Sequence, residues 1–84
     1  MKNLQETAES IELGRISRDL ISKKIEFAYN IGPEDCFRYL TVSCKQVEIV
    51  VNEKLSYEIY SLKDSQKLET FKNYKKLMKY LNLL

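Results

Sequence analysis

Histidine is absent from this sequence of 84 residues. Without an imidazole the chain has no His-ligated metal site, no imidazole acid–base catalysis and no histidine-dependent catalytic triad. Glycine is scarce, and because Gly14 and Gly32 stand alone there is no glycine-rich loop to hold a nucleotide phosphate. These absences remove most hydrolase mechanisms and argue against nucleotide hydrolysis.

Cysteine is also rare, and Cys36 and Cys44 do not have the spacing of a CxxC motif. If both lie on one strand, about 26 Å separates them at ~3.3 Å per residue, which is too far for a disulfide. We therefore expect two buried free thiols, and we expect no metal and no cofactor.

Long apolar runs are missing as well, since the longest spans only a few residues and a membrane helix needs about 20. The first ten residues, MKNLQETAES, lack the apolar core of a signal peptide. The sequence thus predicts a soluble, cytoplasmic protein with no membrane partner and no evident small-molecule substrate.

The composition that remains, 44% hydrophobic and 31% charged residues, is typical of one small globular domain covering residues 1–84. Its charge is unevenly distributed. The net charge is −2 over residues 1–35, zero over residues 36–62 and +4 over residues 63–84, where six lysines accompany two acidic residues. The basic C-terminal segment is therefore a candidate for contact with an acidic partner.

A first helix is expected from about residue 4, where Asn3 and Glu6 have the form of a capping box. Two apolar stripes lie on nearly opposite sides of this helix, and they consist of Leu4, Ala8 and Ile11, then Leu13, Ile16 and Leu20. The change of side falls near Gly14. Either the helix breaks there, or a continuous helix contacts its own sheet and a second partner, or the first half is not a stable helix.

Residues 24–31 alternate between apolar and mostly polar positions, which predicts a strand at 24–30. The following Gly32 and Pro33 could also end a helix. A helix over residues 4–31 would be about 40 Å long, which is long for so small a domain. The strand is therefore favoured.

The centre of the sequence predicts an antiparallel meander of three segments, 36–44, 46–52 and 55–62. A three-residue loop in the second hairpin would place Glu48 opposite Glu58, and opposed like charges are unfavourable. A five-residue loop pairs Glu48 with Tyr60 instead. We favour the longer loop.

The last segment, residues 70–84, has the periodicity of an amphipathic helix. Its apolar side carries Phe71, Tyr74, Leu77, Met78, Leu81 and Leu84, and its opposite side carries Lys72, Lys75, Lys76 and Lys79. The predicted fold is α+β, with an N-terminal helix, a three- or four-stranded antiparallel meander and a C-terminal helix packed on the sheet. This fold requires Leu77 and Leu81 to be buried.

The second face of the predicted sheet is rich in apolar side chains, namely Phe37, Tyr39, Val50, Tyr60 and Leu62. One helix could cover each face, or both helices could cover one face while residues 24–31 shield the other. Alternatively the second face receives a partner, most simply a second copy of the chain. The candidate partner-binding residues, on this face or on the first helix, are Leu4, Ala8, Ile11, Phe37, Tyr39 and Tyr60.

The charged residues suggest two further functions, one for paired carboxylates and one for the lysines. Paired carboxylates, Glu48 with Glu58 or Glu34 with Asp35, could serve catalysis or cation binding, but such residues on strands and turns usually face water. Glu48 and Glu58 would also repel phosphates from a sheet that stacks RNA bases. Nucleic acid could instead bind, largely without sequence specificity, to Lys67, Lys72, Lys75, Lys76 and Lys79, assisted by Tyr80.

The sequence thus predicts a small non-enzymatic interaction or regulatory protein that binds another macromolecule and forms a homodimer. Nucleic-acid binding through the basic C-terminal helix is the alternative. A composition rich in Lys, Asn, Ile and Tyr is typical of low-GC bacteria and their phages, which suggests a phage or bacterial accessory protein.

Overall fold

A computed structural model describes residues 7–33 and 37–83 of the chain. Within them the chain forms two α-helices and a five-stranded antiparallel sheet with strand order β1-β2-β3-β4-β5. The elements are α1 (Ala8–Ser22), β1 (Ala28–Ile31), β2 (Arg38–Val42), the 3-10 turn η2 (Ser43–Lys45), β3 (Val47–Val51), β4 (Tyr57–Ser61), β5 (Lys67–Phe71) and α2 (Tyr74–Tyr80). The α+β class is confirmed, with five strands rather than three or four.

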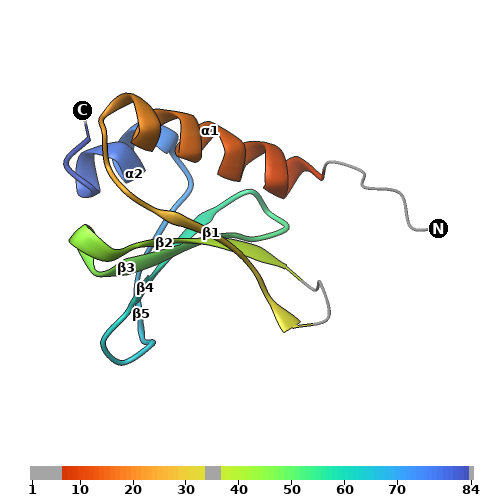
Figure 1. The fold of residues 1–84 in the computed structure, drawn as a ribbon. Helices are drawn as coiled ribbons and strands as arrows, with labels where there is room; N and C mark the ends of the chain where they lie inside the picture. Colours follow the sequence, from red (N-terminus) through yellow and green to blue (C-terminus); the bar gives the residue numbers. More distant parts are fainter. Residues whose placement is uncertain (1–6, 34–36, 84) are drawn as a thin grey trace.

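Both helices lie on the same side of the sheet (Figure 1). We call the side that they cover the inner face and the opposite side the outer face. The core between helices and sheet consists of Leu13, Ile16, Leu20, Leu40, Val42, Val47, Ile49, Val51, Tyr57, Ile59, Leu77, Met78, Leu81 and Leu83. Burial of these large side chains is the main stabilising contribution to the fold.

Helix α1 begins at Ala8, and Thr7 is its N-cap. The capping box predicted at Asn3 and Glu6 lies outside the described residues. Thr7 Oγ1 accepts a hydrogen bond from the Ser10 amide at 3.1 Å, and Ser10 Oγ accepts one from the Thr7 amide at 3.0 Å. This reciprocal pair satisfies two amides that the first turn leaves without a helical acceptor.

Of the alternatives at Gly14, the break is wrong and the helix is continuous, because α1 runs through this residue to Ser22. A glycine inside a helix costs about 1 kcal/mol relative to alanine. The buried stripe of Leu13, Ile16 and Leu20 extends on both sides of Gly14 and packs on the sheet. This tertiary packing outweighs the local penalty and keeps the helix in one piece.

The strand predicted at 24–30 is present, but it covers Ala28–Ile31. Lys24 has a positive φ of 60°, and the Ile25 amide donates to the Leu20 carbonyl oxygen at 2.9 Å. The chain therefore reverses directly after α1 and extends only later. Strand β1 adds an edge to the sheet beside β2, so the alternative in which residues 24–31 shield the other face is wrong. The alternative with one helix on each face is also wrong, since α1 and α2 lie on the same side (Figure 1).

The meander is confirmed, and the longer loop joins β3 to β4. Val51 pairs with Tyr57 and Glu48 pairs with Tyr60, as a five-residue loop requires. The Asn52 side chain stabilises this loop because its Oδ1 accepts hydrogen bonds from two loop amides, those of Lys54 and Ser56, at 3.0 Å each.

The C-terminal helix is shorter than predicted, because Lys67–Phe71 form β5 against β4 and α2 covers only Tyr74–Tyr80. Asn73 starts the helix, since its Oδ1 accepts from the Lys76 amide at 3.1 Å. The prediction that the apolar stripe packs inward is confirmed, because Leu77 and Leu81 are 0% and 2% exposed. Leu84 lies outside the described residues.

The prediction of two buried thiols is wrong for Cys44, which is exposed. Strand β2 ends at Val42, and the chain turns through η2, which places the Cys44 side chain in solvent instead of along the strand. Cys36 lies outside the described residues.

Candidate protein-binding face

Within residues 7–33 and 37–83, no helix lies across the outer face, although apolar side chains are part of its surface. In an antiparallel sheet, residues that pair across strands project from the same face. The register places two rows on the outer face: Ala28, Thr41, Glu48, Tyr60 and Lys67, then Asn30, Tyr39, Val50, Glu58 and Thr70. Aromatic, aliphatic and acidic groups are thus mixed on one surface.

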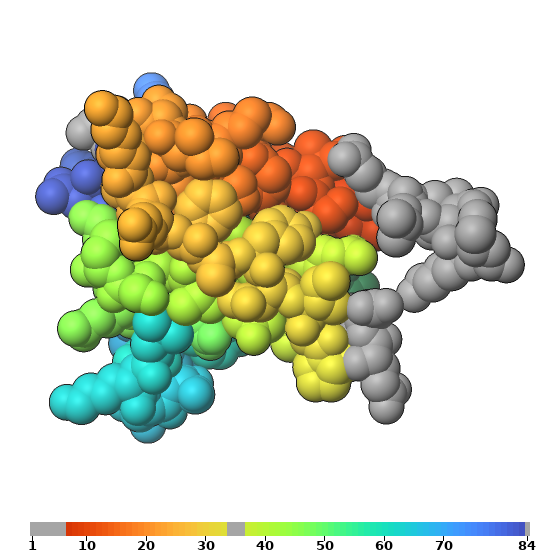
Figure 2. Space-filling view, viewed as in Figure 1, coloured from red at the N-terminus to blue at the C-terminus, as the bar shows by residue number. Residues whose placement is uncertain are grey.

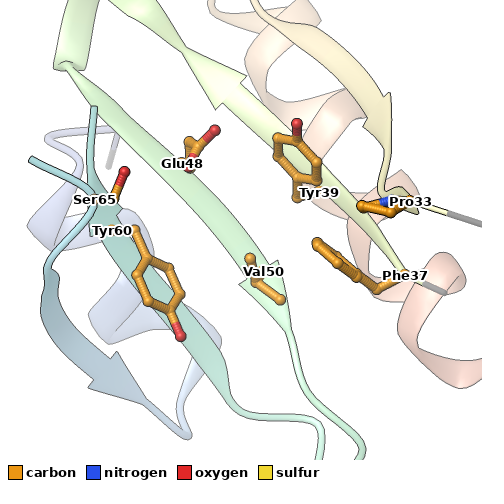
Figure 3. Close-up of a pocket in the computed structure, with 7 residues that line it drawn as sticks. All are labelled: Pro33, Phe37, Tyr39, Glu48, Val50, Tyr60 and Ser65. Carbon is orange, nitrogen blue, oxygen red and sulfur yellow. The ribbon is translucent and has the colours of Figure 1, made fainter. Parts of the chain in front are cut away.

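A groove of about 440 Å³ runs over this surface. Its lining residues are Pro33, Phe37, Tyr39, Glu48, Val50, Tyr60 and Ser65 (Figure 3). In the space-filling view the turn between β4 and β5 projects on one side and the end of β1 on the other, with a hollow between them (Figure 2). The twist of the sheet and these two projections make the outer face concave.

One wall of the groove is aromatic. The rings of Phe37 and Tyr39 are 5.6 Å apart between centroids and tilted by 34°, and Phe37 is 46% exposed. The Phe37 ring lies directly on the backbone of Gly32, where an added Cβ would come within 2.5 Å of it. Glycine at this position is therefore what allows the ring to pack against β1.

The Glu58 carboxylate is held on the outer face by two hydrogen bonds. Asn52 Nδ2 donates to Glu58 Oε2 at 2.8 Å, and the Tyr60 hydroxyl donates to Glu58 Oε1 at 2.7 Å. These bonds lower the pKa of Glu58, the Asn52 bond first, while the same carboxylate raises the pKa of Tyr60. At neutral pH Glu58 is therefore a fixed negative charge beside a neutral tyrosine.

Glu48 contributes a second carboxylate, and this one lines the groove itself. Figure 3 places it between the strands that carry Tyr39 and Tyr60. It pairs across strands with Thr41 and Tyr60 and not with Glu58. No basic side chain among the described residues forms an ion pair with it.

The predicted partner-binding residues do not form one surface. Phe37, Tyr39 and Tyr60 line the groove, whereas Ala8 and Ile11 are exposed on α1, which lies across the inner face. Leu4 lies outside the described residues. The groove and the exposed side of α1 are therefore separate candidate surfaces.

The predicted basic helix face is also divided. Lys75, Lys76 and Lys79 are exposed on α2, but Lys72 precedes this helix and Lys67 lies on β5, opposite Tyr60. This division arises because β5 covers Lys67–Phe71, so the helix begins later than the predicted start at residue 70. The placement of Lys72 on the helix is wrong, whereas Lys75, Lys76 and Lys79 lie on α2 as predicted.

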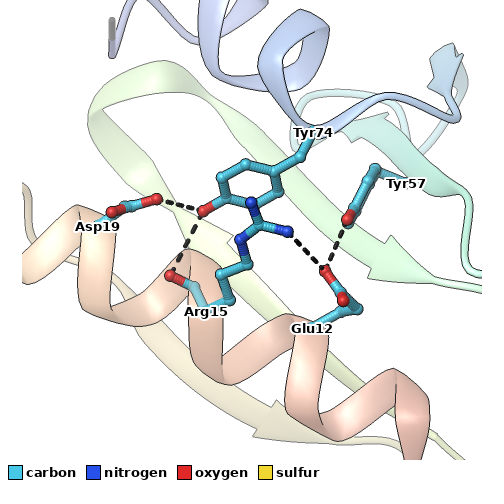
Figure 4. A network of polar contacts seen from close by, with 5 residues as sticks. All are labelled: Glu12, Arg15, Asp19, Tyr57 and Tyr74. Carbon is cyan, nitrogen blue, oxygen red and sulfur yellow. Dashed lines mark hydrogen bonds and ion pairs between the residues drawn. The ribbon is translucent and has the colours of Figure 1, made fainter.

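A polar network that the sequence did not predict joins α1, β4 and α2 (Figure 4). The Tyr57 hydroxyl donates to Glu12 Oε1 at 2.6 Å, and the Tyr74 hydroxyl donates to Asp19. The Arg15 guanidinium lies 3.7 Å from the centre of the Tyr74 ring, and its Nη1 is 3.7 Å from Glu12 Oε1. These contacts fix both helices to each other and to the sheet.

Both tyrosines of the network are held in their neutral form. Burial, followed by the hydrogen bond and the charge of Glu12, raises the pKa of Tyr57 to about 12. Burial and the Asp19 carboxylate likewise raise the pKa of Tyr74. Each tyrosine therefore acts as a hydrogen-bond donor to a carboxylate of α1 at neutral pH.

Among residues 7–33 and 37–83, no group of three cysteine, aspartate or glutamate side chains is placed to hold a metal ion. Within the same ranges, no helix combines the length and the apolar character that crossing a bilayer requires. Glu34 and Asp35, the second carboxylate pair of the sequence analysis, lie outside the described residues.

Comparison with protein families, curated proteins and solved structures finds no match to this chain. The chemistry of its own surfaces is accordingly the basis for a functional proposal.

Proposed function

We propose that this chain is a small non-enzymatic domain that binds another protein through its outer face. The observation that carries the proposal is the uneven covering of the sheet. Both helices pack on the inner face, and the outer face presents a concave surface with aromatic and aliphatic groups at its centre and polar groups around them. Aromatic anchors surrounded by polar groups are typical of protein interfaces.

The charges of this face favour a protein over a nucleic acid as its partner. Tyrosine rings on a sheet resemble a base-stacking platform, but Glu48 and Glu58 lie on the same surface and repel phosphates. Two carboxylates near apolar groups, of which Glu58 is held by hydrogen bonds, are compatible with a protein partner that supplies donors or positive charge.

Val50→Asp tests this proposal, because Val50 is half-buried at the floor of the groove and points away from the core. We expect a protein that co-purifies with the tagged wild type from its native cells to be lost with Val50→Asp. The matched control is Ile11→Asp, which adds the same charge on the exposed side of α1, where Ile11 is 52% exposed. Circular dichroism of each variant confirms that it folds.

Loss with Ile11→Asp and retention with Val50→Asp would assign binding to α1 and overturn the proposal for the outer face. Sedimentation of the wild type over a dilution series separates a second copy from another protein, since the monomer has a mass of 9.9 kDa. A particle that doubles in mass with concentration, and does not do so as Val50→Asp, identifies the homodimer as the form of binding.

Nucleic-acid binding through the C-terminal lysines is a second candidate. It is favoured by Lys75, Lys76 and Lys79, which are exposed on α2 and form no ion pair with any described residue. Their contact with phosphates would release counterions and make the affinity fall steeply with salt.

Reversal of Lys75, Lys76 and Lys79 to glutamate tests this candidate in a mobility-shift assay with DNA and with RNA. If the candidate holds, the wild type binds at about 50 mM salt and the triple variant does not. A control variant reverses three other lysines, Lys23, Lys54 and Lys63, all of which are exposed. A site on α2 is excluded if the wild type leaves the mobility of DNA and RNA unchanged. It is also excluded if both triple variants lose nucleic-acid binding to the same extent.

A further inference from the structure

The groove contains the residue types of a site that binds a positively charged side chain. This makes a more specific inference possible than a general docking surface. We propose that the groove binds an arginine side chain of the partner protein, with the guanidinium beside the Glu48 carboxylate and against the tyrosine rings. This inference rests on the proposed function and specifies the chemistry of the partner.

The groove combines the two kinds of group that bind a guanidinium in proteins. Tyr39 and Tyr60 stand on either side of it, Val50 forms its floor, and the Glu48 carboxylate lies between the strands that bear the tyrosines (Figure 3). A planar guanidinium stacks on aromatic rings and also donates to a carboxylate, which a compact ammonium group does less well. Arginine is therefore favoured over lysine.

The protein already contains this arrangement within its own fold. The Arg15 guanidinium lies 3.7 Å from the centre of the Tyr74 ring and 3.7 Å from the Glu12 carboxylate (Figure 4). The groove brings together the same residue types, tyrosine and glutamate. Among the described residues, no arginine other than Arg15 stacks on an aromatic ring, so the guanidinium of such a contact in the groove would come from another molecule.

The paired strand residues of the outer face include two carboxylates, Glu48 and Glu58, and one cation, Lys67, whose charge also lowers the pKa of Glu58, so their net charge is negative. Glu58 is anchored by Asn52 and Tyr60, so its charge stays on the outer face without any rearrangement. A fixed charge near the site favours a cationic side chain and loses little free energy to reorganisation.

The same carboxylates argue against a second copy as the occupant. Face-to-face stacking about a two-fold axis through the groove would bring the Glu48 carboxylate toward its own equivalent in the other copy, and like charges in an interface are costly. Docking of the lysines of α2 into the groove of another copy would be a head-to-tail contact. Such contacts extend into open chains of copies unless their rotation closes.

The test is a titration of the ¹⁵N-labelled full chain, followed by NMR. The probe is an unstructured peptide of glycine and serine with three arginines, and its matched control has citrulline at the same positions, which keeps the shape and removes the charge. We expect the arginine peptide to shift the amide signals of Tyr39, Val50 and Tyr60. The citrulline peptide should bind at least about tenfold more weakly, a factor that corresponds to about 1.4 kcal/mol.

Two variants locate the interaction. Glu48→Gln should weaken binding of the arginine peptide by about five- to tenfold. Glu53→Gln removes the same charge from an exposed loop position and should change the affinity for this peptide by less than about twofold. Equal binding of arginine and citrulline peptides, equal effects of the two variants, or shifts confined to other surfaces would each overturn the proposal. A lysine peptide that binds as tightly as the arginine peptide would overturn the preference for a guanidinium.

Failure of this inference can be distinguished from failure of the proposed function. If the arginine peptide does not perturb the groove while Val50→Asp still abolishes capture of the native partner, the outer face binds a protein by other chemistry. If Val50→Asp leaves capture unchanged, the docking face itself is wrong.

Discussion

Ile49→Ala is expected to lower the free energy of unfolding by about 2–5 kcal/mol, the usual range for truncating a buried isoleucine. Ile49 is 0% exposed and pairs across strands with Leu40 and Ile59 beneath the two helices. Since small domains have total stabilities of only about 5–15 kcal/mol, this single change removes a large part of the total. Urea denaturation followed by circular dichroism measures it.

Val50 provides the control, because it is adjacent in sequence and projects from the opposite face. Val50→Ala should change the free energy of unfolding by less than about 1 kcal/mol, since the side chain is only half-buried and its loss opens no cavity in the core. Equal losses for Ile49→Ala and Val50→Ala would mean that the outer face is packed as tightly as the inner face. That result would contradict the arrangement on which the proposed function depends.

Tyr57→Phe is expected to lower the free energy of unfolding by about 1.5–3 kcal/mol, the range for a hydrogen bond to a charged group. The variant keeps the ring in the core but removes the hydroxyl that donates to Glu12 across 2.6 Å. Tyr29→Phe is the matched control. Tyr29 is 44% exposed and its hydroxyl forms no hydrogen bond with a described residue, so this change should have little effect.

The effect of Tyr57→Phe should also depend on pH in a defined direction. The pKa of Tyr57 is raised from 10.0 to about 12, so folding favours its protonated form. The stability that this proton provides is complete below pH 10 and is lost as the pH rises through about 12. The difference in stability between wild type and Tyr57→Phe should therefore shrink over this interval. A constant difference from pH 8 to pH 12 would show that neither burial nor Glu12 raises the pKa of Tyr57 in the folded chain.

The central part of the fold could be predicted from sequence because its signals are local and mutually consistent. Alternation with period two identifies the strands, and the unfavourable pairing of Glu48 with Glu58 selects the register in which Glu48 meets Tyr60. The helical period over Leu77 and Leu81 likewise identifies their buried side correctly.

Strand β5 could not be predicted in this way. Its residues, Lys67–Phe71, are mostly exposed because the strand is at the edge of the sheet, and a shift in register at Ile59 and Tyr60 disturbs its alternation. Phe71 also fits the apolar stripe of the helix that follows. The strand forms because it can pair with the edge of β4. This pairing depends on tertiary structure, so the local sequence pattern does not reveal it.

The candidate site was also only partly predictable from the local sequence. The apolar character of Phe37, Tyr39 and Tyr60 is visible in the sequence, but the choice of face for each helix depends on packing in three dimensions. The network of Tyr57 and Tyr74 with α1 joins residues 45 and 55 positions apart and has no local signature.

The contact between Phe37 and Gly32 makes the shape of the groove sensitive to substitution at position 32. One hydrogen atom at position 32, in place of a methyl group, determines how closely the ring approaches the chain behind it. A larger residue there would clash with the Phe37 ring and displace it, and this would change the shape of the groove that Phe37 lines. If the groove binds a protein as proposed, a substitution at Gly32 would therefore change how well that protein fits, although Gly32 is not among the residues that line the groove.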